Sequence, residues 1–162
     1  NKVTATRNNF NISKIVSNTP LQLNNRLSEK YNCNVYIKRE DLQKVRSFKI
    51  RGAYNKIFNL TDEEKRKGVV CASAGNHAQG VALTCSNLGI KGDIFIPEQT
   101  PLQKSDRIKY FGGDQCNVYK IGKNFNDCLD NALEYCNKNN MIFIHNNTEL
   151  SFLLFANFFL DK

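Results

Sequence analysis

A lysine set between two arginines is the first candidate for chemistry in this chain. Residues 46–52 read RSFKIRG, with Arg46 and Arg51 on either side of Lys49. A lysine in the first turn of a helix meets the positive end of the helix dipole, and the two arginines add like charge. Together with the apolar Phe48, these effects favour the neutral amine, which is the nucleophile that a Schiff base requires. The alternative, a solvated basic cluster at the start of a helix, stays open at this point.

A glycine-containing turn is the second candidate. Residues 73–80 read SAGNHAQG and follow an apolar run directly. Ser73 is a predicted helix N-cap, and Gly75 can take backbone angles closed to other residues. The unpaired N–H groups at such a helix start attract a phosphate or a carboxylate. The segment matches neither the G-x-G-x-x-G dinucleotide loop nor a Walker loop, and an ordinary capped helix start remains the alternative.

Short apolar runs alternate with helical segments along the chain and must position both candidates. These runs predict strands at 35–38, 69–73, 93–97, 117–121 and 141–145. Nearly continuous apolar strands that alternate with helices predict an α/β fold, in which a parallel twisted sheet carries helices on both faces. Because ligands bind beyond the carboxyl ends of such strands, the turns after the second, third and fourth of these strands are the expected site.

Apolar periodicity and capping signals predict the helices between these strands. The first expected helix begins after Ser47. The other four cover 61–67, 78–88, 101–111 and 125–136. Gly68 and Gly89 are the predicted ends of two of them. Thr100 and Pro101 are the predicted cap and first residue of the fourth helix.

The composition argues against several classes of function. The 162 residues carry a formal net charge of +8, but the 23 lysines and arginines are spread along the chain without a nucleic-acid-binding motif. Six cysteines without a C-x-x-C pair indicate free thiols in a reducing compartment, and two distant histidines give little support to a metal site. The chain opens with no secretion signal. We expect a cytoplasmic protein that binds no metal, nucleic acid or membrane.

The two candidate motifs together resemble a known enzyme family. SFKIRGA (47–53) and SAGNHAQG (73–80) look like the pair found in pyridoxal-phosphate enzymes of the tryptophan-synthase-β type, also called fold type II. Within that group the chain resembles threonine ammonia-lyase, or threonine dehydratase, from TPLQL (19–23) to MIFIH (141–145). The resemblance includes three further motifs, VYIKREDLQ (35–43), TPLQKSDRIKYFGG (100–113) and GKNFNDC (122–128).

The resemblance implies a cofactor, pyridoxal 5'-phosphate, and a role for each matching residue. Lys49 matches the lysine that holds the cofactor as a Schiff base and later removes the α-proton of the substrate. Phe48 matches the aromatic residue beside the cofactor, and Asn76 matches the asparagine that hydrogen-bonds the ring hydroxyl. The loop that holds the substrate carboxylate matches Ser73, Ala74, Gly75, Asn76 and His77.

The implied reaction is the dehydration and deamination of L-threonine, and secondarily of L-serine. Threonine gives 2-oxobutanoate and ammonia, in isoleucine biosynthesis or in threonine catabolism. The resemblance also implies a homo-oligomer for the full-length family. A serine racemase-like enzyme and a non-catalytic remnant domain are the alternatives.

The resemblance further implies a division of the chain. Residues 1–45 resemble the first strip of the large domain, and residues 46–144 resemble the small α/β domain with the lysine and the substrate loop. Residues 145–162 diverge into an apolar tail, where the family pattern continues with the rest of the large domain and its phosphate loop. We therefore expect this chain alone to bind the cofactor weakly and to turn over little or no threonine.

Overall fold

Four parallel strands form the main sheet of the protein. The computed structural model describes residues 15–146. The strand order is β5-β4-β3-β6, and every neighbouring pair is parallel. The bounds are Val69–Ala72 for β3, Gly92–Ile96 for β4, Cys116–Lys120 for β5 and Ile142–Phe143 for β6. The predicted α/β fold with a parallel sheet is confirmed, although the last predicted strand shortens to two residues.

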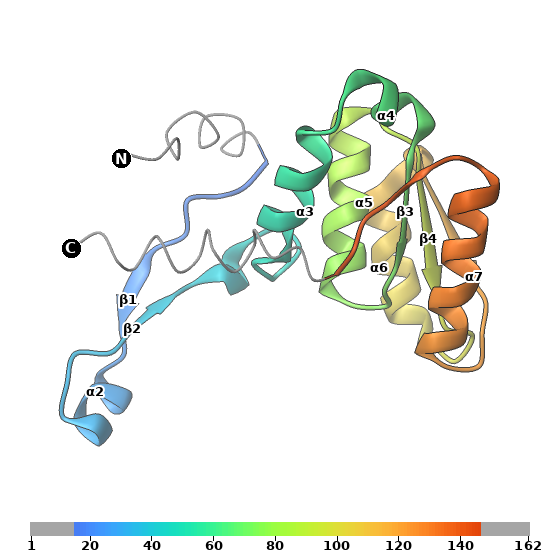
Figure 1. Cartoon of the computed structure of the whole chain (residues 1–162). Helices are drawn as coiled ribbons and strands as arrows, with labels where there is room; N and C mark the ends of the chain where they lie inside the picture. The colour runs from blue at the N-terminus through green and yellow to red at the C-terminus, as the bar shows by residue number, and fades with distance from the viewer. Residues whose placement is uncertain (1–14, 147–162) are drawn as a thin grey trace.

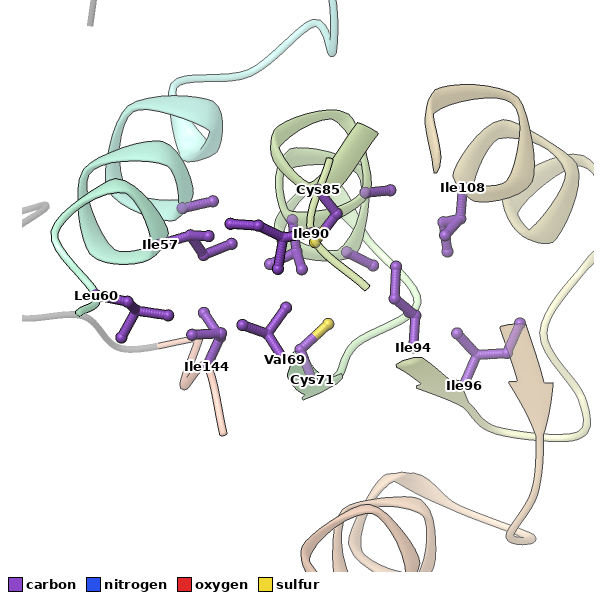
Figure 2. Close-up of a cluster of buried hydrophobic side chains, with 14 residues drawn as sticks. Ile57, Leu60, Val69, Cys71, Cys85, Ile90, Ile94, Ile96, Ile108 and Ile144 are labelled. Atoms are coloured by element: carbon purple, nitrogen blue, oxygen red, sulfur yellow. The ribbon is translucent and has the colours of Figure 1, made fainter. Parts of the chain in front are cut away.

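Three helices cover one face of this sheet. Helix α5 (Asn76–Leu88) lies on the strands, and α3 (Lys49–Phe58) and α6 (Leu102–Gly112) pack beside it (Figure 1). Figure 2 shows how side chains from the three helices, among them Ile57, Cys85 and Ile108, lie over Val69 of β3 and Ile94 of β4. All five side chains are fully buried, so this cluster is the main hydrophobic core.

The opposite face of the sheet is covered by α7 (Phe125–Lys138), as Figure 1 shows. Val70 and Ala72 alternate with the core-facing residues of β3 and pack against Cys128 and Ala132 of this helix. A strand buried on both faces explains the continuous apolar run in the sequence, because neither side of the pleat meets water.

Local signals fix most helix ends, with a correction at the start of α6. Helix α4 (Asp62–Lys67) begins with a capping box in which the Thr61 and Glu64 side chains each bond to the other's backbone N–H. The prediction that Thr100 caps the fourth helix is wrong: Pro101 occupies the N-cap position, and Leu102 is the first helical residue. The backbone N–H of Ser105 bonds to the carbonyl of Pro101 and closes the first turn.

Residues before α3 form an arm that projects away from the main sheet (Figure 1). In it, β1 (Leu21–Leu23) pairs antiparallel with β2 (Tyr36–Lys38), and α2 (Asn25–Tyr31) connects them. The predicted strand at 35–38 therefore exists, but it belongs to this separate sheet. Short 3₁₀ turns, η1 (Glu40–Leu42) and η2 (Gly113–Gln115), complete the fold.

Three expectations concern the tail of the chain, a membrane and a metal ion. The apolar tail predicted for 145–162 lies outside the described residues from position 147 onward. Within residues 15–146, no helix has the length and apolar character needed to cross a membrane. The same residues contain no group of three or more His, Cys, Asp or Glu side chains arranged for a metal ion.

Candidate functional site

Lys49 is the first residue of α3, as its predicted place in the first turn requires. The Oγ of Ser47 accepts a hydrogen bond of 3.2 Å from the backbone N–H of Lys49. The half-buried side chain extends so that Nζ donates to the carbonyl oxygen of Asn146 at 3.3 Å. It also lies 5.5 Å from the ring centroid of Phe48, close enough for a cation–π contact. The amine is therefore held beside an aromatic ring.

The 73–77 turn connects β3 to α5 and leaves the start of that helix open. The prediction that Ser73 is the N-cap is wrong: Gly75 takes that position, and no side chain caps the helix. The Ser73 Oγ instead accepts a 3.3 Å hydrogen bond from the N–H of Gly75, within the turn. The first backbone N–H groups of α5 lack partners inside the helix, which makes this end suitable for an anion.

The backbone of Gly75 departs from the expected conformation. Its φ of −116° and ψ of −152° are extended, so the glycine is not required by a left-handed turn. A side-chain carbon at this position would meet no atom within 4 Å. The space in front of the turn is therefore open, and a ligand can approach the backbone closely. The neighbouring Asn76 is exposed, and its amide makes no hydrogen bond within the described part of the chain.

His77 turns its ring into the protein and away from the open side of the turn. Its side chain is buried, and Nε2 lies 3.2 Å from the carbonyl oxygen of Ile144. Burial lowers the pKa of His77 to about 4, the hydrogen bond to Ile144 opposes that shift, and the positive charge of Lys49 adds to it. The neutral ring then donates from Nε2 to the carbonyl. What His77 offers a ligand is its backbone N–H.

The lysine and the turn lie side by side because α3 and α5 approach closely. A side-chain carbon at Gly80 would lie 3.3 Å from the Cα of Ile50 and 3.3 Å from the carbonyl carbon of Lys49. Such spacing is tighter than ordinary packing, so a glycine permits this approach. Gly80 is one turn of helix after Asn76. The two motifs, separated in sequence by a strand and two helices, therefore form one surface.

The sequence reasoning missed the groups that hold this surface in place. The carbonyl groups of Ile144 and Asn146 bind His77 and Lys49, and both belong to a stretch interpreted as strand or tail. Glu40 pairs with Arg51 in the same first turn as Lys49. A glycine inside a helical pattern was a usable signal for the close approach at Gly80. No local pattern indicates the other contacts.

The surface can hold part of a cofactor. It presents a primary amine for an aldehyde, an exposed amide at Asn76, and an open helix start for an anion. Hollows of about 280 and 850 Å³ lie elsewhere, along the arm and between α5 and α6, and border neither Lys49 nor the 73–77 turn. The candidate site is therefore neither of these two hollows, and its described residues form a surface around Lys49 and the 73–77 turn.

Other proteins are similar to this chain in sequence. The biosynthetic L-threonine dehydratase IlvA of Staphylococcus epidermidis is 56% identical over 133 residues, which are 82% of this chain and 32% of that protein. The corresponding protein of Bacillus subtilis is 53% identical over 135 residues, which are 83% of this chain and 32% of that protein. The chain spans about a third of the length of the curated relatives that it matches.

Solved structures show the same fold. The processed form of threonine deaminase isoform 2 from Solanum lycopersicum superposes with a TM-score of 0.77 at 44% identity, over 83% of this chain and 36% of that one. Maize serine racemase superposes with a TM-score of 0.74 at 32% identity, over 85% of this chain and 41% of that one. The family model described as pyridoxal-phosphate dependent enzyme matches residues 12–153. The chain therefore belongs to the family of pyridoxal-phosphate dependent enzymes.

Proposed function

We propose that this chain supplies the reactive lysine and the substrate turn of a pyridoxal-phosphate dependent L-threonine ammonia-lyase, which also accepts L-serine. The observation that carries the proposal is the close approach at Gly80, because it sets Lys49 beside an uncapped helix start. The names and the high identity of the threonine dehydratases support this reaction over others of the family. The products from threonine are 2-oxobutanoate and ammonia.

The residues fit the cofactor and the substrate in distinct roles. Bound pyridoxal phosphate supplies an aldehyde that amines attack and a ring that withdraws electrons from the α-carbon of the substrate. Lys49 would hold the aldehyde carbon at Nζ, and the same nitrogen, as a free amine, would take the α-proton of the substrate. Phe48 excludes water beside it, and Asn76 binds the ring hydroxyl through its free amide.

The 73–77 turn orients the substrate for this proton transfer. The N–H groups of Asn76 and His77 hold the carboxylate at the positive end of α5, with the Ser73–Ala74–Gly75 segment shaping the approach. Holding the carboxylate fixes the α-carbon relative to Lys49, and such positioning is a large part of catalysis. The neutral ring of His77 adds no charge that would compete for the substrate.

The wider assignments rest on the same proposal. Residues 1–45 form the start of a large domain, and 46–144 form the small domain with the lysine and turn. The phosphate loop is contributed by residues other than those described. The setting is isoleucine biosynthesis in the cytoplasm, in agreement with the biosynthetic relatives, and the complete enzyme is a homo-oligomer.

A serine racemase-like activity is the second candidate, because maize serine racemase shares the fold at 32% identity. The two reactions differ in their products. An ammonia-lyase converts L-threonine to 2-oxobutanoate, whereas a racemase releases D-serine from L-serine. Assaying the enzyme that carries these residues with both amino acids separates the two.

The direct test is to trap the cofactor on the lysine. The purified chain is incubated with pyridoxal phosphate, reduced with borohydride and mapped by peptide mass spectrometry. We expect the pyridoxyl group at Lys49 and less of it when L-threonine competes. Lys49→Ala removes that signal, whereas Lys56→Ala, at an exposed position on the same helix, leaves it unchanged. Labelling spread over exposed lysines without preference for Lys49 would contradict the proposal.

A further inference from the structure

A buried carboxylate near the candidate lysine accepts hydrogen bonds at both of its oxygens. Glu40 is 7% exposed. Arg51 donates to it twice, from Nε to Oε2 at 2.8 Å and from Nη2 to Oε1 at 2.7 Å, which is the planar two-point geometry of a strong ion pair. The hydroxyl of Thr19 and the amide of Gln43 donate to the same carboxylate. Burial acts to raise the pKa of Glu40, but the Arg51, Thr19 and Gln43 donors outweigh it and lower that pKa.

The donors around Glu40 come from three separate segments. Gln43 donates from Nε2 to the carbonyl of Ser17 at 2.9 Å and accepts from the N–H of Ser17 at 3.0 Å. Ser17 and Thr19 belong to the irregular segment before β1, Glu40 and Gln43 to the turn after β2, and Arg51 to α3. The network therefore attaches the first turn of α3 to the arm.

The first turn of α3 is thus held from two sides. Arg51 is two residues after Lys49, which places the two side chains about 200° apart around the helix axis. The backbone of Lys49 and Ile50 meets Gly80 of α5, while Arg51 is fixed by Glu40. The N-cap residue Phe48 makes no side-chain hydrogen bond to the start of α3, and the Ser47 hydroxyl accepts from the N–H of Lys49 alone. The ion pair therefore has a direct part in setting the rotation and height of the turn that carries Lys49.

We propose that Glu40 is a positioning residue that, through its two-point ion pair with Arg51, holds the Lys49 amine at the candidate site. This inference rests on the proposed role of Lys49. A shift of a reacting group by about 1 Å costs up to roughly a hundredfold in rate, and loss of one anchored side of a helix turn permits such a shift. Asp41 provides the matched contrast. Its carboxylate also forms a two-point pair, with Arg39 at 2.8 and 2.9 Å, but that pair is exposed and does not reach α3.

The test compares Glu40→Gln with Asp41→Asn. The initial rate of borohydride-trapped pyridoxal phosphate incorporation is measured separately at Lys49 and at Lys56, on protein kept below its melting temperature. We expect Glu40→Gln to slow labelling of Lys49 by about tenfold and to leave Lys56 unchanged, because only the placement of the first turn is lost. Asp41→Asn should leave both rates unchanged. General loosening of α3 would alter labelling at both lysines instead.

Amide hydrogen exchange gives a readout that needs no cofactor. Glu40→Gln should speed exchange in the first turn of α3, and Asp41→Asn should not. If Glu40→Gln fails to fold, Arg51→Lys keeps the charge but loses the two-point geometry, and Lys49 should again be labelled several-fold more slowly. Unchanged Lys49 labelling and exchange in a folded variant would overturn the positioning role. Absence of preferential Lys49 labelling in the unaltered chain would instead overturn the proposed function.

Discussion

The main sheet and the arm are stabilised in different ways. Strands β3 and β4 are buried along their whole length, between α5 on one face and α7 on the other. In the arm, every residue of β1 is exposed, and Leu21 and Tyr36 each expose 51% of their surface. Hydrophobic burial therefore stabilises the main sheet along its whole length, whereas the described part of the arm is attached only at its base. There Ile15, Val16 and Val45 pack against α3 and α5, beside the polar contacts around Glu40.

The candidate site lies where these two regions meet. Lys49 begins the first helix after the arm, and the 73–77 turn belongs to the main sheet. The well-packed region supplies the rigid turn, and the junction with the arm orients the lysine. The exposed apolar side chains of the arm have the character of a surface that packs on further protein.

The largest expected difference between the two regions is in the loss of stability when a strand isoleucine is replaced by alanine. Ile94 of β4 is fully buried, whereas Ile37 of β2 is 38% exposed. Ile94→Ala leaves a cavity in the main core and should lower the free energy of unfolding by about 3 kcal/mol. Ile37→Ala should lower it by less than about 1 kcal/mol. Denaturant titration measures both, and equal losses would remove the distinction between the two regions.

Acid should weaken the main sheet before it weakens the junction. The pKa of His77 is about 4 in the folded protein and 6.5 in its ordinary state, so the unfolded chain binds the proton first as pH falls. The free energy of unfolding should therefore decrease between pH 6.5 and 4, by up to about 3 kcal/mol. The pKa of Glu40 is lowered from 4.5, so its contribution is fully present above about pH 4.5 and is lost only as the pH falls from there through the lowered pKa.

Melting curves between pH 7 and 4 measure this effect. His77→Gln retains an amide donor but no titrating ring, and it should flatten the decrease between pH 6.5 and 4. The exposed His145 provides the control, since His145→Gln should keep the decrease. A decrease of full size in His77→Gln would assign the acid sensitivity to another group.

The sequence predicts the main sheet well because burial dictates its pattern. The runs at 69–73 and 93–97 are apolar on both faces of the pleat, which few other structures require. The LQL strand of the arm lacks such a pattern, since all three of its residues are exposed to solvent. The sequence analysis therefore missed β1 and α2. The MIFIH run shortens to two residues because only Ile142 and Phe143 pair with β3.

Some features of the candidate site are set by neighbouring residues in the sequence, and others by residues far away in it. That Lys49 opens a helix and that residues 73–77 form a turn after a strand follow from neighbouring residues. The inward ring of His77 and the bond from Lys49 to Asn146 depend on carbonyl groups 67 and 97 positions away. No period or cap in the sequence indicates where a side chain points over such distances.

A close contact at a glycine tests how tightly the main region is packed. A side-chain carbon at Gly112, at the end of α6, would lie 2.4 Å from the Cβ of Cys116 and must displace it. Gly112→Ala should lower the free energy of unfolding by about 2 kcal/mol through overpacking. Gly75→Ala provides a control, because a side chain there meets no atom within 4 Å. Thermal melting that shows no difference between the two variants would mean that α6 and β5 separate easily.

The smallest effect comes from two asparagines that cap helices in the same way. Asn24 accepts from the N–H of Leu27 at 2.9 Å at the start of α2, and Asn124 accepts from Asp127 at 3.0 Å at the start of α7. Alanine at such a cap costs about 1 kcal/mol of helix stability. Helix α7 buries residues in the core, whereas α2 buries none, so the same local loss has different consequences.

Asn124→Ala should therefore lower the free energy of unfolding of the main region by about 1 kcal/mol, as seen by denaturant titration. Asn24→Ala should leave that value nearly unchanged and instead speed amide exchange within α2, because the helix can fray without exposing a core. A loss of global stability in Asn24→Ala equal to that in Asn124→Ala would show that the arm unfolds together with the main sheet. In that case the junction at Glu40 would couple the two regions more strongly than their packing indicates.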